Sequence, residues 1–144
     1  MNLIAHALNN TYQIVINNKA HLNLDNYISN KNKLVVIIDD KVDESLFSSL
    51  LSKSLVFKIT ASEKIKNLET IQNIFEFLFQ NNVTRDDTLI SIGGGVTSDI
   101  TGLVASLYKR GINWISIPTT LLAMVDASIG GKVGVNFSFN KLWL

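Results

Sequence analysis

A glycine triplet stands between two apolar segments past the middle of the chain. Gly93, Gly94 and Gly95 follow an apolar run at 89–92 and precede an amphipathic run at 100–110. Glycines lack a Cβ, so their backbone can approach a ligand closely. Free amide N–H groups at a helix start also bind anions such as a pyrophosphate. The pattern indicates a phosphate cradle, and a tight strand-to-helix turn has the same pattern.

Hydroxyl, carboxylate and ammonium groups follow downstream. Thr119 and Thr120 come directly after a proline, where they could equally cap the next helix. Asp126 lies in an apolar stretch, where a bare carboxylate is costly unless it is paired. Lys132 follows two glycines and can reach a phosphate or carboxylate as a compact charge. These groups suit recognition of a phosphorylated ligand.

Strands and helices must alternate to position these groups. Strands are predicted at 12–16, 34–38, 55–59, 88–92 and 112–117, with an extended stretch at 133–136. Helices are predicted at 42–51, 68–79 and 100–110, with shorter ones at 22–28 and 121–128, and turns at 17–19 and 130–132. The alternation predicts an α/β fold, a Rossmann-like, mostly parallel sheet with helices on both faces.

Single residues refine this outline. Asp39 and Asp40 end a continuous apolar strand, at the edge where open α/β sheets bind ligands. Gly102 costs about 1 kcal/mol inside a helix, which predicts close contact with the sheet. Gly111 suits a left-handed helix cap. On the two longest helices, the apolar stripes are predicted to be buried, including Leu68, Phe79 and Leu107.

Composition narrows the class of protein. The 144 residues suit one domain, and 47% hydrophobic with 17% charged residues exclude a disordered chain. A net charge of +1 gives no reason to expect nucleic acid or a membrane surface as partner. The absence of cysteine excludes disulfides and thiolate zinc sites. No apolar stretch reaches about 18 residues and no signal peptide pattern is visible, so a cytoplasmic protein is expected.

A continuous string of residues carries a family resemblance. After Gly93-Gly94-Gly95-Val96 and Asp99, residues 117–136 read Ile-Pro-Thr-Thr-Leu-Leu-Ala-Met-Val-Asp-Ala-Ser-Ile-Gly-Gly-Lys-Val-Gly-Val-Asn. The block closely resembles 3-dehydroquinate synthase. The resemblance implies a shikimate-pathway lyase that converts 3-deoxy-D-arabino-heptulosonate 7-phosphate to 3-dehydroquinate and phosphate. It also implies NAD, a divalent metal (zinc or cobalt), a homodimer, and an NAD-binding α/β domain followed by a helical domain.

The resemblance also assigns roles to residues. Cofactor-binding positions are Asp39, Glu63, Lys66, Gly94, Gly95, Val96, Asp99, Thr119 and Thr120, and catalytic positions are Arg110, Asp126, Lys132 and Lys141. Arg110 matches an arginine that reaches the neighbouring subunit's site; otherwise it is a helix C-terminal cation. Asp99 could instead favour the first helical turn, and Glu63 with Lys66 could be a solvated pair. Lys141 is a weaker match, because its neighbours differ from the family's Gly-Lys-Asn.

Departures from the family pattern bear on completeness. Ser98 replaces a usual glycine and is expected to crowd the cofactor slightly, and Lys41 stands where asparagine is common. The family's metal ligands, one glutamate and two histidines, match nothing in this chain, and His6 and His21 match no ligand position. Asn136 is expected to have only a local structural role.

We therefore expect residues 1–144 to be one nucleotide-binding domain, incomplete at its C-terminal end and without the helical metal domain. Such a chain is expected to be inactive alone. Its apolar surface would invite self-association. The alternatives are another sugar-phosphate cyclase or a non-catalytic NAD-binding fragment.

Overall fold

A computed structural model describes residues 2–7, 10–17, 24, 26–28, 32–129, 132–137 and 140–143. The chain divides into two compact units, Met1–Asn30 and Lys31–Leu144. In the first, β1 (Asn2–Ala7) pairs antiparallel with β2 (Asn10–Val15). The strand predicted at 12–16 is therefore confirmed as β2, whereas β1 was not predicted. The turn at 17–19 falls largely outside the described residues, and of the helix predicted at 22–28 only residues 24 and 26–28 are described.

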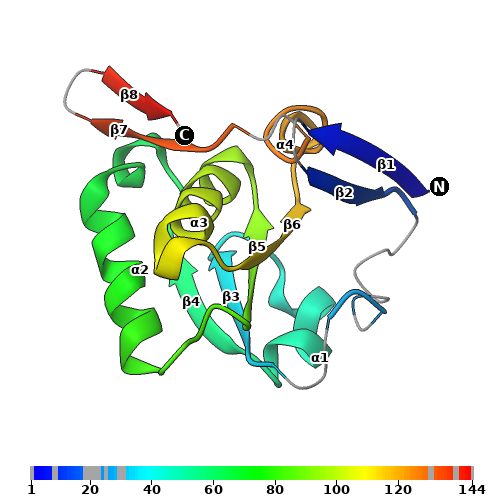
Figure 1. Ribbon diagram of the computed structural model, residues 1–144, viewed down its shortest axis with the longest axis horizontal. Coiled ribbons are helices and arrows are strands. Elements are labelled where there is room, and N and C mark those ends of the chain that lie inside the picture. Colours follow the sequence, from blue (N-terminus) through cyan, green and yellow to red (C-terminus); the bar gives the residue numbers. More distant parts are fainter. Residues whose placement is uncertain are drawn as a thin grey trace. The chain divides into compact units, whose positions relative to one another are not determined.

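Four parallel strands form the centre of the second unit (Figure 1). Their order is β4 (Leu55–Ile59), β3 (Leu34–Asp39), β5 (Thr88–Gly93) and β6 (Asn113–Pro118). All three pairings are parallel. The chain leaves β3 for β4 on one side and later returns to β5 on the other side. Ligands of doubly wound sheets bind at such a reversal, outside the carboxyl ends of the strands.

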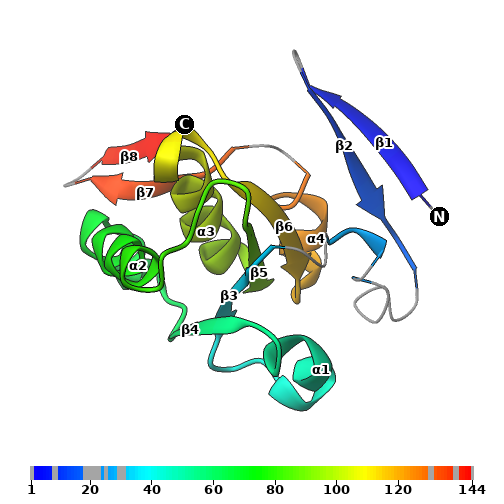
Figure 2. The ribbon, with the colours of Figure 1, turned by 60° about the horizontal axis from the view of Figure 1, so that its bottom comes forward.

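Helices cover both faces of this sheet. The short helices η2 (Glu44–Phe47) and α1 (Ser48–Leu51) join β3 to β4, while α2 (Leu68–Gln80) precedes β5 and α3 (Gly95–Leu107) follows it. Figure 2 shows α2 and α3 on one side of the sheet and α1 on the other. Right-handed connections that run across a sheet in opposite directions place their helices on opposite faces. Here the connection from β3 to β4 runs one way and the connection from β4 to β5 runs the other. The predicted α/β architecture is confirmed.

Side chains alternate between two buried faces along the central strands. Val35 and Ile37 are fully buried in a cluster with residues of α2 and α3, among them Ile74 and Leu103. The intervening Val36 and Ile38 are also fully buried and point to the opposite face. A strand covered on both faces reads as a continuous apolar run, as β3 does.

The glycine triplet is not a loop. Gly93 ends β5, Gly94 is the N-cap of α3, and Gly95 is its first helical residue. The helix therefore begins five residues before the predicted start at 100, and it ends at Leu107. A 3-10 turn, η4 (Tyr108–Arg110), follows it.

The chain leaves α3 through three residues with positive φ. These are Lys109 (48°), Arg110 (67°) and Gly111 (113°). The positive φ predicted at Gly111 is confirmed, but the left-handed region begins two residues earlier than expected.

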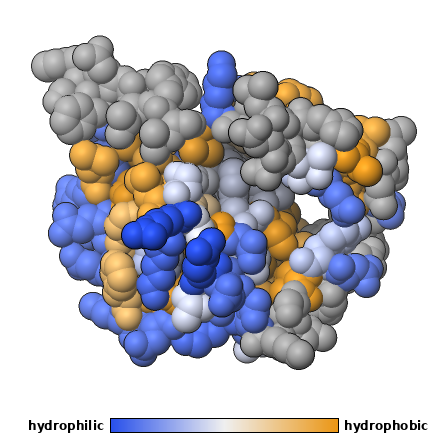
Figure 3. All heavy atoms as spheres, viewed as in Figure 1, coloured by the Kyte–Doolittle hydropathy of each residue, from blue (hydrophilic) through white to orange (hydrophobic). Residues whose placement is uncertain are grey.

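Three residues predicted on buried stripes are exposed. Leu68 is 44% exposed, Phe79 is 59% exposed and Leu107 is 47% exposed. Figure 3 shows apolar side chains gathered over the junction of α2 and α3, between hydrophilic ones. The Phe79 ring lies 5.2 Å from that of Tyr108, which is buried beneath the surface. The exposed stripe is therefore an outer layer over the aromatic part of the core.

A second hairpin follows the sheet. β7 (Gly134–Phe137) pairs antiparallel with β8 (Asn140–Trp143), which confirms the extended stretch at 133–136. The first two residues of the turn predicted at 130–132 lie outside the described residues. A Cβ on Gly102 would lie 2.3 Å from Val133 Cγ1 and 2.8 Å from Trp114 Cη2. Gly102 is thus in close contact with the sheet, as predicted.

Candidate functional site

The glycine turn joins the carboxyl ends of β5 and β6. The carbonyl of Gly93 accepts the N–H of Thr119 at 2.8 Å, and the carbonyl of Gly94 accepts the N–H of Ser98 at 3.1 Å. No described side chain caps α3. The first amides of a helix have no intrahelical acceptor, so they remain available to a ligand.

Only the first of the three glycines is required by the protein's own packing. A Cβ on Gly93 would lie 2.4 Å from Thr97 Oγ1, which no real side chain tolerates. A Cβ on Gly94 would lie 3.4 Å from Thr120 Cγ2, and one on Gly95 would lie 3.8 Å from Ala127 Cβ. Both are ordinary van der Waals distances, and Gly94 has a φ of −81°. Packing against the described residues would therefore admit alanine at these two positions and does not explain their bare backbone.

Thr97 was not selected from the sequence. Its Oγ1 atom is fully buried behind the turn and has no hydrogen-bond partner among the described residues. Buried hydroxyl groups usually have a hydrogen-bond partner, so a buried hydroxyl without one is an uncommon feature of this turn.

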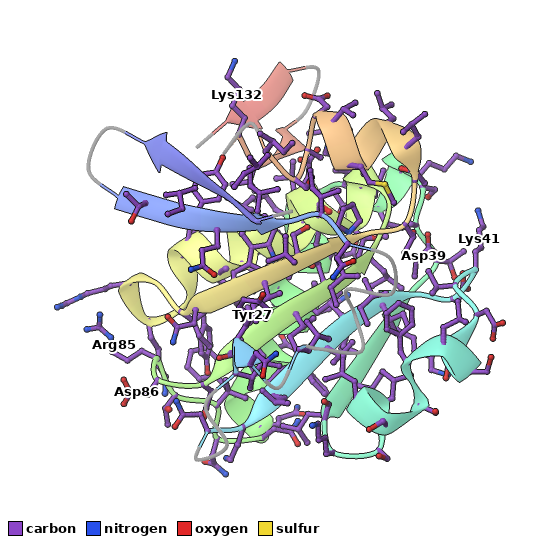
Figure 4. All side chains as sticks on the ribbon, turned by 90° about the vertical axis from the view of Figure 1, so that its right-hand side faces the viewer. Tyr27, Asp39, Lys41, Arg85, Asp86 and Lys132 are labelled. Carbon is purple, nitrogen blue, oxygen red and sulfur yellow. The ribbon has the colours of Figure 1, made fainter. Side chains whose placement is uncertain are left out.

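Asp39 stands beside the glycine turn on the neighbouring strand. The register pairs Ile38 with Ile92, so the next residues along are Asp39 and Gly93. Asp39 Oδ1 accepts the backbone N–H of Lys41 at 3.2 Å and that of Ala61 at 3.5 Å. Figure 4 shows Asp39 and Lys41 at this end of β3. A carboxylate at this edge can accept hydrogen bonds from ribose hydroxyls.

Lys66 and Asp99 form a largely buried ion pair. Lys66 Nζ donates to Asp99 Oδ2, and the side chains are only 6% and 15% exposed. The alternative of a solvated surface pair is therefore wrong for Lys66, although Glu63 is exposed. Asp99 lies beyond the first turn of α3, where the helix dipole has little effect. Its interaction is with Lys66 instead.

The two threonines have different places. Thr120 is the N-cap of α4 (Leu121–Val125), and its Oγ1 accepts the N–H of Ala123 at 3.2 Å. Its methyl group is also the nearest atom to the open side of Gly94. Thr119 is exposed and is held by its backbone bond to Gly93. The capping role is confirmed for Thr120, which also lies beside the glycine turn.

Among the four residues assigned to catalysis, Arg110 lies far from the glycine turn. Arg110 follows the 13-residue α3, so it lies about 20 Å from the glycine turn, at the amino-terminal edge of the sheet. Lys132 is exposed, and in Figure 4 it points away from Asp39. The backbone of Lys141 pairs with Asn136 in β8, and its side chain is outside what the structure describes.

Asp126 and Ser98 differ from expectation. Asp126 is exposed at the end of α4, whose Val125 is 66% exposed, so its carboxylate needs no buried partner. The apolar sequence around it is surface, not core. Ser98 is 1% exposed, and its hydroxyl lies 3.3 Å from that of Ser116 on β6. It therefore faces the sheet, and the expected crowding of a cofactor is wrong.

Asn136 was assigned only a local role, yet it contacts the segment that carries Glu63 and Lys66. Its backbone N–H donates to the carbonyl of Lys66 at 2.7 Å, and its Nδ2 donates to the carbonyl of Glu63 at 3.4 Å. No sequence signal pairs residues that lie 73 positions apart.

Two absences hold within the described residues. No group of three or more His, Cys, Asp or Glu side chains could hold a metal ion there. In the same part of the chain, no helix has the length and apolar character needed to cross a membrane.

The fold and site define a doubly wound α/β domain with a glycine turn between β5 and α3, at the carboxyl end of the sheet. Residues 56–144 match the family model described as 3-dehydroquinate synthase N-terminal. The chain belongs to the 3-dehydroquinate synthase family. It is 45% identical over 136 residues to the 3-dehydroquinate synthase of Campylobacter concisus (strain 13826), covering 91% of this chain and 38% of that protein. It is 42% identical over 138 residues to that of Staphylococcus haemolyticus (strain JCSC1435), covering 92% and 39%. The chain thus spans little more than a third of these relatives.

Solved structures share the fold. A 2-deoxy-scyllo-inosose synthase, complexed with carbaglucose-6-phosphate, NAD+ and Co2+, superposes with a TM-score of 0.89 at 22% identity, over 100% of this chain and 43% of that one. The 2-epi-5-epi-valiolone synthase from Streptomyces hygroscopicus subsp. jinggangensis 5008, with NAD+ and Zn2+ bound, gives a TM-score of 0.79 at 32% identity, over 94% and 40%.

Proposed function

We propose that this chain is the NAD-binding part of a 3-dehydroquinate synthase. The observation that carries the proposal is the contrast within the glycine triplet. Packing requires Gly93, whereas Gly94 and Gly95 are bare although the fold would admit a Cβ. A pyrophosphate lying on the free amides of Gly95 and Val96 supplies the missing reason. NAD+ in two solved relatives of the same fold supports the choice of ligand.

The neighbouring groups suit the rest of the dinucleotide. Asp39, at the end of the adjacent strand, would accept hydrogen bonds from ribose hydroxyls. Lys66, held by Asp99, places a positive charge near the helix start and offsets the carboxylate there. Thr119 and Thr120 would lie on the nicotinamide side. When bound, NAD supplies a hydride acceptor and donor.

Substrate and metal require more than the described residues bring together. Asp126, Lys132 and Lys141 would face the sugar-phosphate substrate, and Arg110 would serve the neighbouring subunit of a homodimer. Its position far from its own glycine turn supports that role. The described residues offer no ligand set for the family's zinc or cobalt, so no metal step is assigned to them. We also propose that the protein acts in the shikimate pathway and is located in the cytoplasm.

Two alternatives have less support. Another sugar-phosphate cyclase fits the fold, but the curated relatives at 42% and 45% identity are 3-dehydroquinate synthases. A non-catalytic NAD-binding fragment would share the cofactor site and lack the reaction.

Calorimetric titration of the purified 144-residue chain with NAD tests the proposal. We expect saturable binding to the wild-type chain and a much weaker response to ATP. Absence of binding at millimolar NAD, with the chain shown to be folded by circular dichroism, would contradict the proposal. The sugar-phosphate specificity is tested in a second experiment. This chain is combined with the remaining part of a homologous 3-dehydroquinate synthase, and the release of phosphate from the sugar-phosphate substrate is measured.

A further inference from the structure

Residues 62–67 form a short connection between β4 and α2, which we call the strap. It contains the 3-10 turn η3 (Glu63–Ile65) and carries two of the proposed cofactor-binding residues, Glu63 and Lys66. Its C-terminal end is fixed, because Asn67 caps α2 by accepting the N–H of Thr70 at 2.9 Å. Within the strap, the N–H groups of Ile65, Lys66 and Asn67 donate to strap carbonyls at 3.2, 3.3 and 2.9 Å, so its place against the rest of the fold depends on contacts with other elements.

The strap is tied to two other elements. On one side, the ammonium group of Lys66 reaches Asp99 on α3. On the other side, Asn136 of β7 donates its backbone N–H to the Lys66 carbonyl at 2.7 Å and its side-chain amide to the Glu63 carbonyl at 3.4 Å. Asn136 therefore contacts both ends of the segment that presents the two cofactor-binding side chains.

The geometry of β7 makes this contact possible. Asn136 stands opposite Lys141 in the antiparallel hairpin. Alternate residues of such a pair direct their N–H groups toward or away from the partner strand. The N–H of Asn136 is given to the strap, so it points away from β8. The preceding Val135 is fully buried in the core, which fixes β7 beneath this contact.

Lys66 depends on this support. Lys66 is only 5% exposed. A buried ammonium group is tolerated only while its charged partner stays in place. If the strap moved by a few ångströms, water would replace Asp99 around the ammonium group.

We infer that Asn136 is a positioning residue that holds the strap so that Lys66 meets Asp99 at the cofactor site. The role of the strap as part of a cofactor site rests on the proposed function. The positioning of Lys66 itself does not, and it is tested without any ligand.

The test measures how fast an amine-reactive acetylating reagent labels Lys66 in the full chain, with mass spectrometry as the readout. Three variants are compared: Asn136→Ala, which removes the side-chain donor, Asn136→Pro, which also removes the N–H, and Asn113→Ala, an exposed asparagine on β6, as control. Losing one hydrogen bond should raise the labelling of Lys66 about two- to tenfold, and losing both should raise it further. Lys64, exposed on the same strap, should be labelled equally in all chains. Unchanged labelling of Lys66 in Asn136→Ala, with an unchanged melting temperature, overturns the inference.

A second measurement separates positioning from a general loss of stability. In a wild-type chain that binds NAD, Asn136→Ala should weaken binding about two- to tenfold. In a Lys66→Met background the same substitution should have a clearly smaller effect, because only Glu63 of the two side chains on the strap remains. Equal effects in both backgrounds would contradict the inference. If the wild-type chain binds no NAD while the labelling result holds, the proposed function fails and the positioning role stands.

Discussion

Lys66 and Asp99 are paired across 33 positions of sequence, and the pair is almost closed off from water. The lysine comes from the strap before α2 and the aspartate from the second turn of α3. Such a pair contributes little net stability but is costly to break, because one charge is left buried alone. The pair therefore holds the strap against α3, the helix that begins at the glycine turn.

The Lys66–Asp99 pair gives the first prediction. Lys66→Met alone, or Asp99→Asn alone, should lower the free energy of unfolding by about 3 kcal/mol. The double variant Lys66→Met with Asp99→Leu should recover most of that loss, since neither charge remains. Urea denaturation at pH 7 measures both. Additive losses in the double variant would show that the two side chains act independently.

The exposed pair of Lys58 and Glu44, 2.5 Å apart, is a matched control whose disruption should change stability by less than about 1 kcal/mol.

The glycine triplet gives the second prediction. Among the described residues outside the start of α3, the nearest atom to the methyl group of Gly95→Ala is 3.8 Å away, so the free energy of unfolding should be unchanged or slightly raised. The same methyl group would keep a phosphate from the helix amides, so the affinity for NAD should fall about tenfold to a hundredfold. Gly93→Ala should instead lower stability by about 1 to 3 kcal/mol, because its Cβ would overlap Thr97.

Thermal unfolding and calorimetry on the same preparations separate these two effects. If Gly95→Ala bound NAD as tightly as the wild-type chain, the glycine turn would not be the pyrophosphate site.

The sheet was predictable because its strands carry their own signal. Each of the four parallel strands is a short segment rich in apolar and β-branched residues, which favours a buried strand. The parallel direction of the strands follows from their alternation with helices, whereas their order in the sheet does not. The start of α3 was missed for a local reason. Glycine has a low helix propensity, so the sequence predicts Gly95 in a turn, although α3 begins there.

The contacts of the site were less predictable, because tertiary structure selects them. The sequence offers Lys64 and Lys66 to Asp99 without distinction, and only the strap decides that Lys66 faces inward. The role of Asn136 depends on a backbone N–H that is given to Lys66 and not to the partner strand β8, which no spacing reveals. The apolar neighbours of Asp126 predict a carboxylate that needs a partner, but α4 exposes Val125 and Asp126.

Gly102 gives the third prediction. Gly102→Ala gains about 1 kcal/mol of helix propensity, yet its Cβ would lie 2.3 Å from Val133 Cγ1 and 2.8 Å from the Trp114 ring. Overpacking should dominate, so we expect a net loss of about 1 to 3 kcal/mol in the free energy of unfolding. Adding Val133→Ala removes the nearest atom and should recover part of the loss. Urea denaturation followed by tryptophan fluorescence measures these changes, and a more stable Gly102→Ala chain would contradict the packing argument.

Asp87 gives the fourth prediction, on acid stability. This buried carboxylate accepts the backbone N–H groups of Lys33 at 2.8 Å and Thr84 at 2.7 Å, and the Thr84 hydroxyl at 3.1 Å. Burial by itself raises the pKa of Asp87, but these hydrogen bonds together hold the pKa below its ordinary value of 3.8. A carboxyl with a lowered pKa in the folded state stabilises the fold above its unfolded pKa, and that contribution is lost as the pH falls through the folded value.

Stability should therefore fall below about pH 4 as Asp87 is protonated. Asp87→Asn should be less stable than the wild-type chain at pH 7, because an amide cannot accept all three bonds, and the difference should shrink toward pH 3. Asp86→Asn changes an exposed neighbour, seen at the surface in Figure 4, and should leave the profile unchanged. Urea denaturation between about pH 3 and pH 7 gives the comparison. A constant difference between Asp87→Asn and the wild-type chain over that range would mean that the carboxylate charge contributes nothing to the fold.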